Sequence, residues 1–219
     1  MLGINKDGKK DVLGIWINEN ESATFWTEVF EEIKARGVEE ILFISLDGLS
    51  GLSEAIEKIY PKAKTQRCIV HIVRNIYGIL DKKKSKEIIG DLKKIYTASN
   101  GNNAKLEYEN FIEKYKSNEK LIKKLNSVIE HIFNIFEYPI EIRKIIYTTN
   151  PIESLNSSLR KVTRGKGSFI SKEALLKVLY LRIKDLEKSW SKGTRNWENV
   201  KHQLIELYGE RVLKYYFNT

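Results

Sequence analysis

The chain has 219 residues, of which 42% are hydrophobic and 11% aromatic, so it is long enough to bury a core and too apolar for a disordered chain. Its formal net charge of +9 favours a polyanionic partner. A single cysteine excludes an internal disulfide framework, and no apolar run has the length of a membrane span. We therefore expect a globular cytoplasmic protein without a membrane partner.

The first third of the chain alternates strand and helix patterns. It begins with a hairpin, in which two apolar runs flank a turn that contains Asp7 and Gly8. The elements expected next are a helix capped by Ser22 and stopped by Gly37, a strand over 40–47, a helix capped by Ser53 and bounded by Pro61, a strand over 63–71 and a helix over 71–80.

The remainder of the chain has helical periodicity almost throughout. A helical block follows Asp81 and ends near Pro139, with a loop at "ASNGNN", and two later helices cover about 171–189 and 194–208. This change of character predicts three parts: a core at 1–80, a helical insertion at 81–146 and a C-terminal part of the core at 147–219.

A hairpin ahead of alternating strands and helices indicates an α/β fold with a mixed sheet. The order matches a ribonuclease H-like core with an all-α insertion and C-terminal helices. That layout normally has one further strand before the hairpin, and this sequence has no room for it.

Asp47 is the first candidate for chemistry, because it ends the apolar run "EILFISLD". Ligands usually bind at the carboxyl ends of strands in open α/β sheets. The alternative is a plain turn, since Asp-Gly pairs are common turn formers. Gly48 and Gly51 allow a close approach to the backbone, which slightly favours a functional site.

Glu153 is the second candidate, and it begins a helix. Asn150 suits the N-cap, Pro151 the first position and Glu153 the third, so this carboxylate either caps the helix or holds a metal ion. Its neighbours on the polar face are Asn156, Ser157 and Arg160. Four basic residues follow within seven positions and suit a phosphate-binding surface: Arg160, Lys161, Arg164 and Lys166.

Cys68 and His71 form a third motif, Cys-x-x-His. Only His131 and His202 remain as further histidines, so a closed zinc site is disfavoured against a buried thiol beside a satisfied histidine. Trp190 and Trp197 are expected to be core or staple residues, with base stacking as the minority interpretation.

The segments that hold these motifs resemble the bacterial Mutator-like insertion-sequence transposases, related to the plant Mutator elements. The resemblance rests on "SLDGLSGLSEAIEKIYPKAKTQRCIVHIVRNI" and "YTTNPIESLNSSLRKVTRGKGSF", and it runs from the "GINKDGKKDVLGIWI" hairpin to the "KSWSKGTRNW" tail. The three motifs occur in order, with a helical insert before the last.

The resemblance implies a DDE-type enzyme, in which two Asp and one Glu hold two Mg²⁺ (or Mn²⁺) ions on a ribonuclease H-like core. Asp47 matches the second acid and Glu153 the third. Cys68, His71, Asn150 and Asn156 match supporting motifs. The implied function is DNA transposition by strand cleavage and strand transfer, with double-stranded DNA as substrate.

The sequence also departs from the family pattern. The family's first Asp lies on the strand before the hairpin, and neither that Asp nor the N-terminal DNA-binding region is present here. We therefore expect an N-terminally truncated, catalytically incomplete transposase, associated with the nucleoid and partnered by its own copies or a full-length transposase. The alternative is a non-catalytic module that binds DNA or a transposase.

Overall fold

A computed structural model describes residues 1–18, 20, 22–48, 51–147, 151–165, 168–190 and 193–217. The chain forms two compact units, one from residues 1–39 together with 149–219 and the other from residues 40–148. We call them the terminal unit and the central unit. The three-part organisation expected from the change in sequence character stays a prediction.

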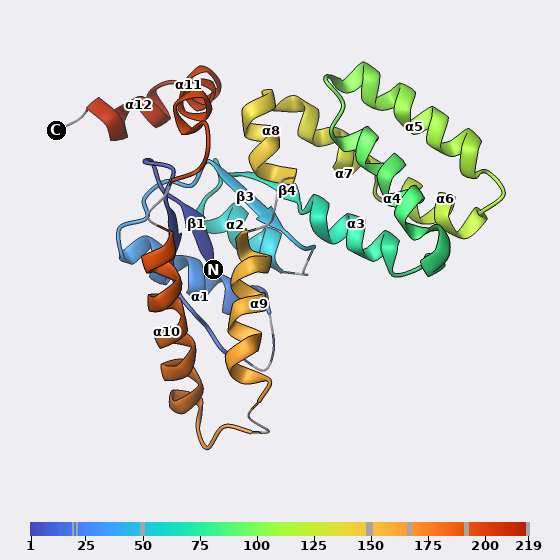
Figure 1. Ribbon diagram of the computed structural model, residues 1–219. Helices are drawn as coiled ribbons and strands as arrows, with labels where there is room; N and C mark the ends of the chain where they lie inside the picture. Colours follow the sequence, from blue (N-terminus) through green and yellow to red (C-terminus); the bar gives the residue numbers. More distant parts are fainter. Residues whose placement is uncertain are drawn as a thin grey trace. The chain divides into compact units, whose positions relative to one another are not determined.

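The terminal unit joins the two ends of the chain (Figure 1). Its elements are β1 (Leu2–Ile4), β2 (Lys10–Val12), α1 (Ala23–Ala35), α9 (Pro151–Thr163), α10 (Lys172–Ser189), α11 (Trp197–Tyr208) and α12 (Glu210–Phe217).

The hairpin and the first helix form where the sequence predicts them. β1 and β2 pair antiparallel, with Gly3 opposite Asp11, and Gly8 in the turn has a φ of 74°. Ser22 caps α1 by accepting a hydrogen bond from the Phe25 amide at 3.2 Å, and Gly37 follows the helix with a φ of 99°. Both glycines adopt the left-handed backbone that residues with a Cβ rarely adopt.

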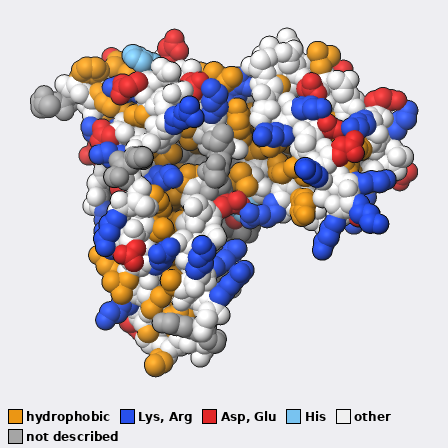
Figure 2. Space-filling model, viewed as in Figure 1, with side chains coloured by type: hydrophobic (Ala, Val, Ile, Leu, Met, Phe, Trp, Pro, Cys, Tyr) orange, Lys and Arg blue, Asp and Glu red, His pale blue; other side chains and the backbone are white. Residues whose placement is uncertain are grey.

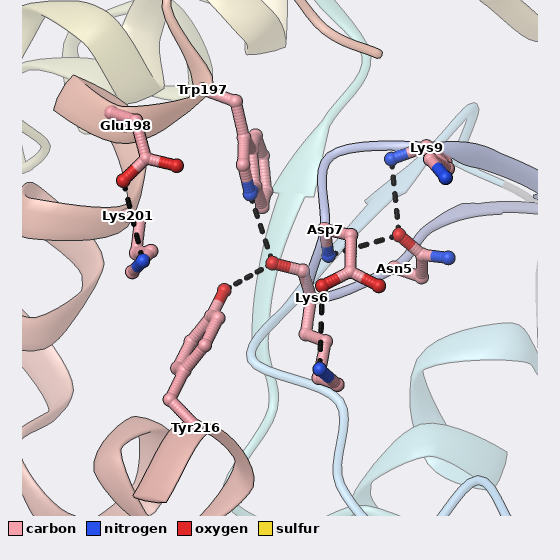
Figure 3. Close-up of polar contacts among 8 residues, drawn as sticks. All are labelled: Asn5, Lys6, Asp7, Lys9, Trp197, Glu198, Lys201 and Tyr216. Carbon is pink, nitrogen blue, oxygen red and sulfur yellow. Dashed lines mark hydrogen bonds and ion pairs between the residues drawn. The ribbon is translucent and has the colours of Figure 1, made fainter. Parts of the chain in front are cut away.

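The C-terminal helices attach to the hairpin turn (Figure 3). Trp197 Nε1 donates to the Lys6 carbonyl at 2.9 Å, and the Tyr216 hydroxyl donates to the same oxygen. The Thr194 amide and hydroxyl both donate to the Gly8 carbonyl, each at 2.7 Å. Trp197 is therefore a packing residue that ties the chain's end to its beginning.

The helices α9 and α10 pack against each other. The apolar side of α9 buries Leu155, as the spacing predicts, but it also buries Ser158. Arg182 of α10 explains this burial, because its Nε donates to the Ser158 hydroxyl at 2.9 Å. A buried polar group needs such a partner.

The central unit begins with a parallel strand pair and continues as helices. Its elements are β3 (Phe43–Leu46), α2 (Leu52–Ile59), β4 (Lys64–Arg67), α3 (Ile69–Tyr77), α4 (Lys82–Tyr96), α5 (Gly101–Tyr115), α6 (Glu119–Asn126), α7 (Ile129–Phe133), the 3₁₀ helix η1 (Asn134–Glu137) and α8 (Ile140–Tyr147).

The core of the central unit is mostly aliphatic. Ile56 of α2, Ile69 and Ile76 of α3, and Leu92 of α4 are at most 1% exposed. One buried cation joins this core: Arg143 of α8 is 6% exposed and donates to the carbonyls of Ala98 and Ser99 at 2.9 and 2.8 Å. These bonds satisfy carbonyls that follow the end of α4.

Several sequence-based boundaries were wrong. The strand expected over 63–71 ends at Arg67, and the run after Cys68 is helical, because Ile69, Ile72 and Ile76 are buried at helical spacing. Ser53 is not a cap, since α2 begins at Leu52 behind left-handed Gly51. The helical block also continues beyond Pro139 as α8, and α5 begins inside the expected "ASNGNN" loop.

The described strands form two separate two-stranded sheets, β1–β2 and β3–β4, and not the single mixed sheet that the sequence predicted. The protein is α/β, with helices predominating. Among the described residues, no helix combines the length and apolarity needed to cross a membrane.

Candidate functional site

Asp47 lies at the carboxyl end of β3, directly beside the end of β4. The two strands are parallel, with Leu46 opposite Arg67, and the Cys68 amide donates to the Leu46 carbonyl at 2.7 Å. Asp47 therefore follows the last paired residue, and its side chain is exposed. This is the position that the sequence predicted for it, and it is where parallel sheets commonly bind ligands.

Cys68 and His71 lie at the amino end of α3. Cys68 is the N-cap residue and is 4% exposed, while His71 is the third residue of the helix and is half-buried. His71 Nδ1 is buried and has no hydrogen-bond partner within the described part of the chain. The motif thus lies beside Asp47 in the strand order, as a consequence of β4 ending at Arg67.

Arg67 is a neighbour of Asp47 that the sequence analysis missed. Gly48 has a φ of 92°, and a Cβ on it would lie 2.9 Å from Arg67 Nε and 3.0 Å from Nη2. The guanidinium therefore covers the Gly48 backbone, which gives the close approach suspected at this glycine a specific partner. The available signal was that Arg67 directly precedes the Cys-x-x-His motif.

Gln66 and His131 support this end of β4. The Gln66 side chain is 3% exposed, and its Nε2 donates to the His131 carbonyl at 2.6 Å and to the Arg67 carbonyl at 3.0 Å. Burial, and then the positive charge of Arg67, lowers the pKa of the His131 imidazole. The lowered pKa favours the neutral form of the His131 imidazole. The positive charge at this end of β4 is therefore that of Arg67, which lies beside Gly48.

Glu153 is the third residue of α9, as predicted, behind Pro151 at the first position. It is half-buried, and its Oε1 is shielded from solvent. Asn156 lies on the exposed side one turn later. The predicted N-cap, Asn150, lies outside the described residues. Asp47 and Glu153 belong to different units.

Basic side chains continue along α9 on the terminal unit. Arg160, Lys161 and Arg164 are all exposed, and Lys166 lies outside the described residues. Figure 2 shows Lys and Arg side chains gathered over the α9–α10 pair on the visible face. Ser158 and Leu155 face the packed side of α9, so these cations are free to contact a polyanion.

Neither unit gathers a complete ligand set for a divalent cation from its described residues. Within the described ranges, no group of three or more His, Cys, Asp and Glu residues is arranged to hold a metal ion. In the central unit, Gly48 follows Asp47, and the side chain against the Gly48 backbone is the cation Arg67 and not a second carboxylate. The residues described here therefore do not make a complete metal site within one unit.

The family model and the related proteins that match this chain are all named as transposases. The family model described as "Transposase, Mutator family" matches residues 1–193. The chain is 36% identical to a Rhizobium meliloti protein named as the transposase for insertion sequence element ISRM3, over 96% of this chain and 53% of that protein. The chain thus spans about half the length of this relative.

Two further relatives have corresponding names. A Corynebacterium diphtheriae protein named as a probable transposase for an insertion sequence element is 35% identical over 98% of this chain and 68% of its own length. The Staphylococcus aureus transposase for IS256 in transposon Tn4001 is 29% identical over 90% and 51%. The motifs, the family model and these relatives agree, and the chain belongs to the Mutator family of transposases.

Proposed function

We propose that this chain provides part of a DDE-type transposase, which moves an insertion element by metal-dependent DNA strand cleavage and strand transfer. The observation that carries the proposal is the position of Asp47, exposed and directly behind the paired end of parallel β3 and β4. The names of the relatives and the order of the three motifs support it. A ribonuclease H-like core is part of the same proposal.

In this proposal Asp47 and Glu153 supply carboxylates to Mg²⁺ or Mn²⁺, which prefer oxygen ligands. Bound ions would activate the attacking oxygen and stabilise the leaving one in an in-line displacement. Arg160, Lys161 and Arg164 bind phosphates of double-stranded DNA, the substrate, in the nucleoid. Copies of this chain or a longer transposase are the protein partners.

Metal binding is the decisive test, because the family resemblance assigns Asp47 and Glu153 as metal ligands. The measurement is Mn²⁺ affinity of the whole chain by titration calorimetry for the unsubstituted protein, Asp47→Asn, Glu153→Gln and the double variant. We expect each single variant to bind Mn²⁺ more weakly than the unsubstituted protein, and the double variant to bind it no more tightly than either single variant.

The matched controls replace one aspartate and one glutamate that lie outside the proposed site. Asp185→Asn and Glu198→Gln change exposed helical side chains, and we expect them to leave Mn²⁺ affinity unchanged. Unchanged Mn²⁺ affinity in both Asp47→Asn and Glu153→Gln would refute the metal assignment. Glu153 would then be a helix-start residue only.

The second candidate is a DNA-binding module without catalysis. The exposed cations of α9 favour it, because they need no metal ion to contact phosphates. Its test is duplex DNA affinity measured over a series of salt concentrations. Affinity that falls steeply with salt, combined with absent Mn²⁺ binding, selects this function over the first.

A further inference from the structure

Arg67 is held in place from both sides. Its backbone is the last residue of β4, paired with Leu46, and its carbonyl accepts a hydrogen bond from the buried Gln66 side chain at 3.0 Å. Its guanidinium lies against the Gly48 backbone, where a Cβ would lie 2.9 Å from Nε, so the guanidinium would have to shift to make room for it. The fork of donors therefore lies at the strand ends, against the residue that follows Asp47.

The guanidinium has no internal acceptor within the described part of the chain. The hydrogen bonds and ion pairs found there include none from the Arg67 side chain, and none joins it to the Asp47 carboxylate. A guanidinium carries five N–H donors, and those of Arg67 are not among the buried unpaired atoms, so they are open to an acceptor from outside the chain. A structural arginine would normally be paired, as Arg143 is.

The surroundings favour an anion from outside the chain. The α3 helix begins two residues after Arg67, and the amino end of a helix carries partial positive charge. Planar guanidinium forks bind phosphate oxygens bidentately, which a point charge does not reproduce.

We propose that Arg67 binds a phosphate of the DNA backbone and holds that strand next to Asp47. The inference rests on the proposed function for its partner, DNA, but not on metal binding. Arg67 is in this view a substrate-binding residue of the central unit, separate from the basic residues of α9. Gly48 suits this arrangement because it leaves space for the guanidinium, and its φ of 92° also favours glycine.

The test compares Arg67→Ala and Arg67→Lys in the whole chain with the unsubstituted protein. Binding to a fluorescein-labelled duplex is followed by anisotropy at stepped NaCl concentrations. One lost phosphate contact lowers the salt slope by about 0.9 and weakens binding roughly tenfold near 0.1 M salt. Arg67→Lys keeps the charge but not the fork, so we expect it to retain the salt slope and still bind more weakly than the unsubstituted protein.

The matched control is Lys62→Ala, which removes one exposed positive charge from the same unit shortly before β4. We expect its salt slope and affinity to match those of the unsubstituted chain. Circular dichroism of each variant checks folding, and Arg67→Lys keeps the aliphatic stem if Arg67→Ala unfolds.

The outcomes separate the two proposals. Duplex binding by the unsubstituted chain with no loss in Arg67→Ala or Arg67→Lys overturns the Arg67 assignment and leaves the proposed function standing. Equal losses in Arg67→Ala and Lys62→Ala also overturn it, because they indicate general charge only. No duplex binding by the unsubstituted chain at low salt overturns DNA as the partner in both.

Discussion

Replacing Gly8 by alanine tests how the two ends of the chain are joined. Gly8 has a φ of 74°, and a Cβ at this position would lie 2.4 Å from Trp197 Cγ and 2.5 Å from Cδ2. Such distances are far inside van der Waals contact, so the indole ring must move. Trp197 would then lose its hydrogen bond to the Lys6 carbonyl.

The expected loss in the free energy of unfolding of Gly8→Ala has two parts. The left-handed backbone costs an alanine about 1–2 kcal/mol. Displacing Trp197 adds about 1 kcal/mol for its hydrogen bond and about 1 kcal/mol or more for lost burial of the half-buried ring. We therefore expect Gly8→Ala to reduce the free energy of unfolding by about 3–4 kcal/mol.

Gly37→Ala provides the matched control. Gly37 has a φ of 99°, and nothing lies within 4 Å of a Cβ built on it. It shares the backbone strain without the collision, so its cost should be only about 1–2 kcal/mol. The assay is urea unfolding of both variants, followed by circular dichroism and tryptophan fluorescence. Equal costs for the two variants would refute the packing of Trp197 on the hairpin turn.

Three further predictions concern the central unit. Arg143→Met removes the bonds to Ala98 and Ser99 and should lower the free energy of unfolding by about 2–3 kcal/mol in urea, whereas the exposed Arg164→Met should change it by less than about 0.5 kcal/mol. Hydrogen bonds from Lys114, then Lys94, hold the pKa of the Asp91 carboxyl far below its usual range, so this stabilisation is present above about pH 4 and is lost as pH falls through the lowered pKa. Asp91→Asn should be less stable at pH 7, and the difference in thermal midpoint should shrink below pH 4; a constant difference would contradict the pairing. Gln66→Leu leaves the His131 carbonyl without its donor, so thermal unfolding should show a loss of about 1–3 kcal/mol, and no loss would contradict the bridge.

Much of the local structure followed from short-range signals. The Asp7–Gly8 turn, the Ser22 cap and the start of α9 at Pro151 depend on residues at most four positions apart, and all three were confirmed. The same reasoning placed Asp47 at the end of a strand, and β3 ends one residue before it. It failed over 63–71, because a short apolar run fits both a strand and a helix.

The candidate site was predictable only in part. Motifs identified Asp47, Glu153, Cys68 and His71, but no pattern within the sequence shows that Gly48 is covered by Arg67. That contact depends on the register of β3 against β4, which pairs residues about twenty positions apart. Register is set by the packing of whole elements, so it is not visible in local propensity.

By itself, the sequence determined the secondary structure at capped and turn positions, the charge and the family motifs, because these are properties of neighbouring residues. The tertiary structure decided that residues 1–39 and 149–219 form one unit, that Thr194 binds the Gly8 carbonyl 186 positions away, and that Arg143 is buried. Bringing distant segments together costs conformational entropy. Each of these contacts forms because apolar burial and satisfied polar groups outweigh that cost.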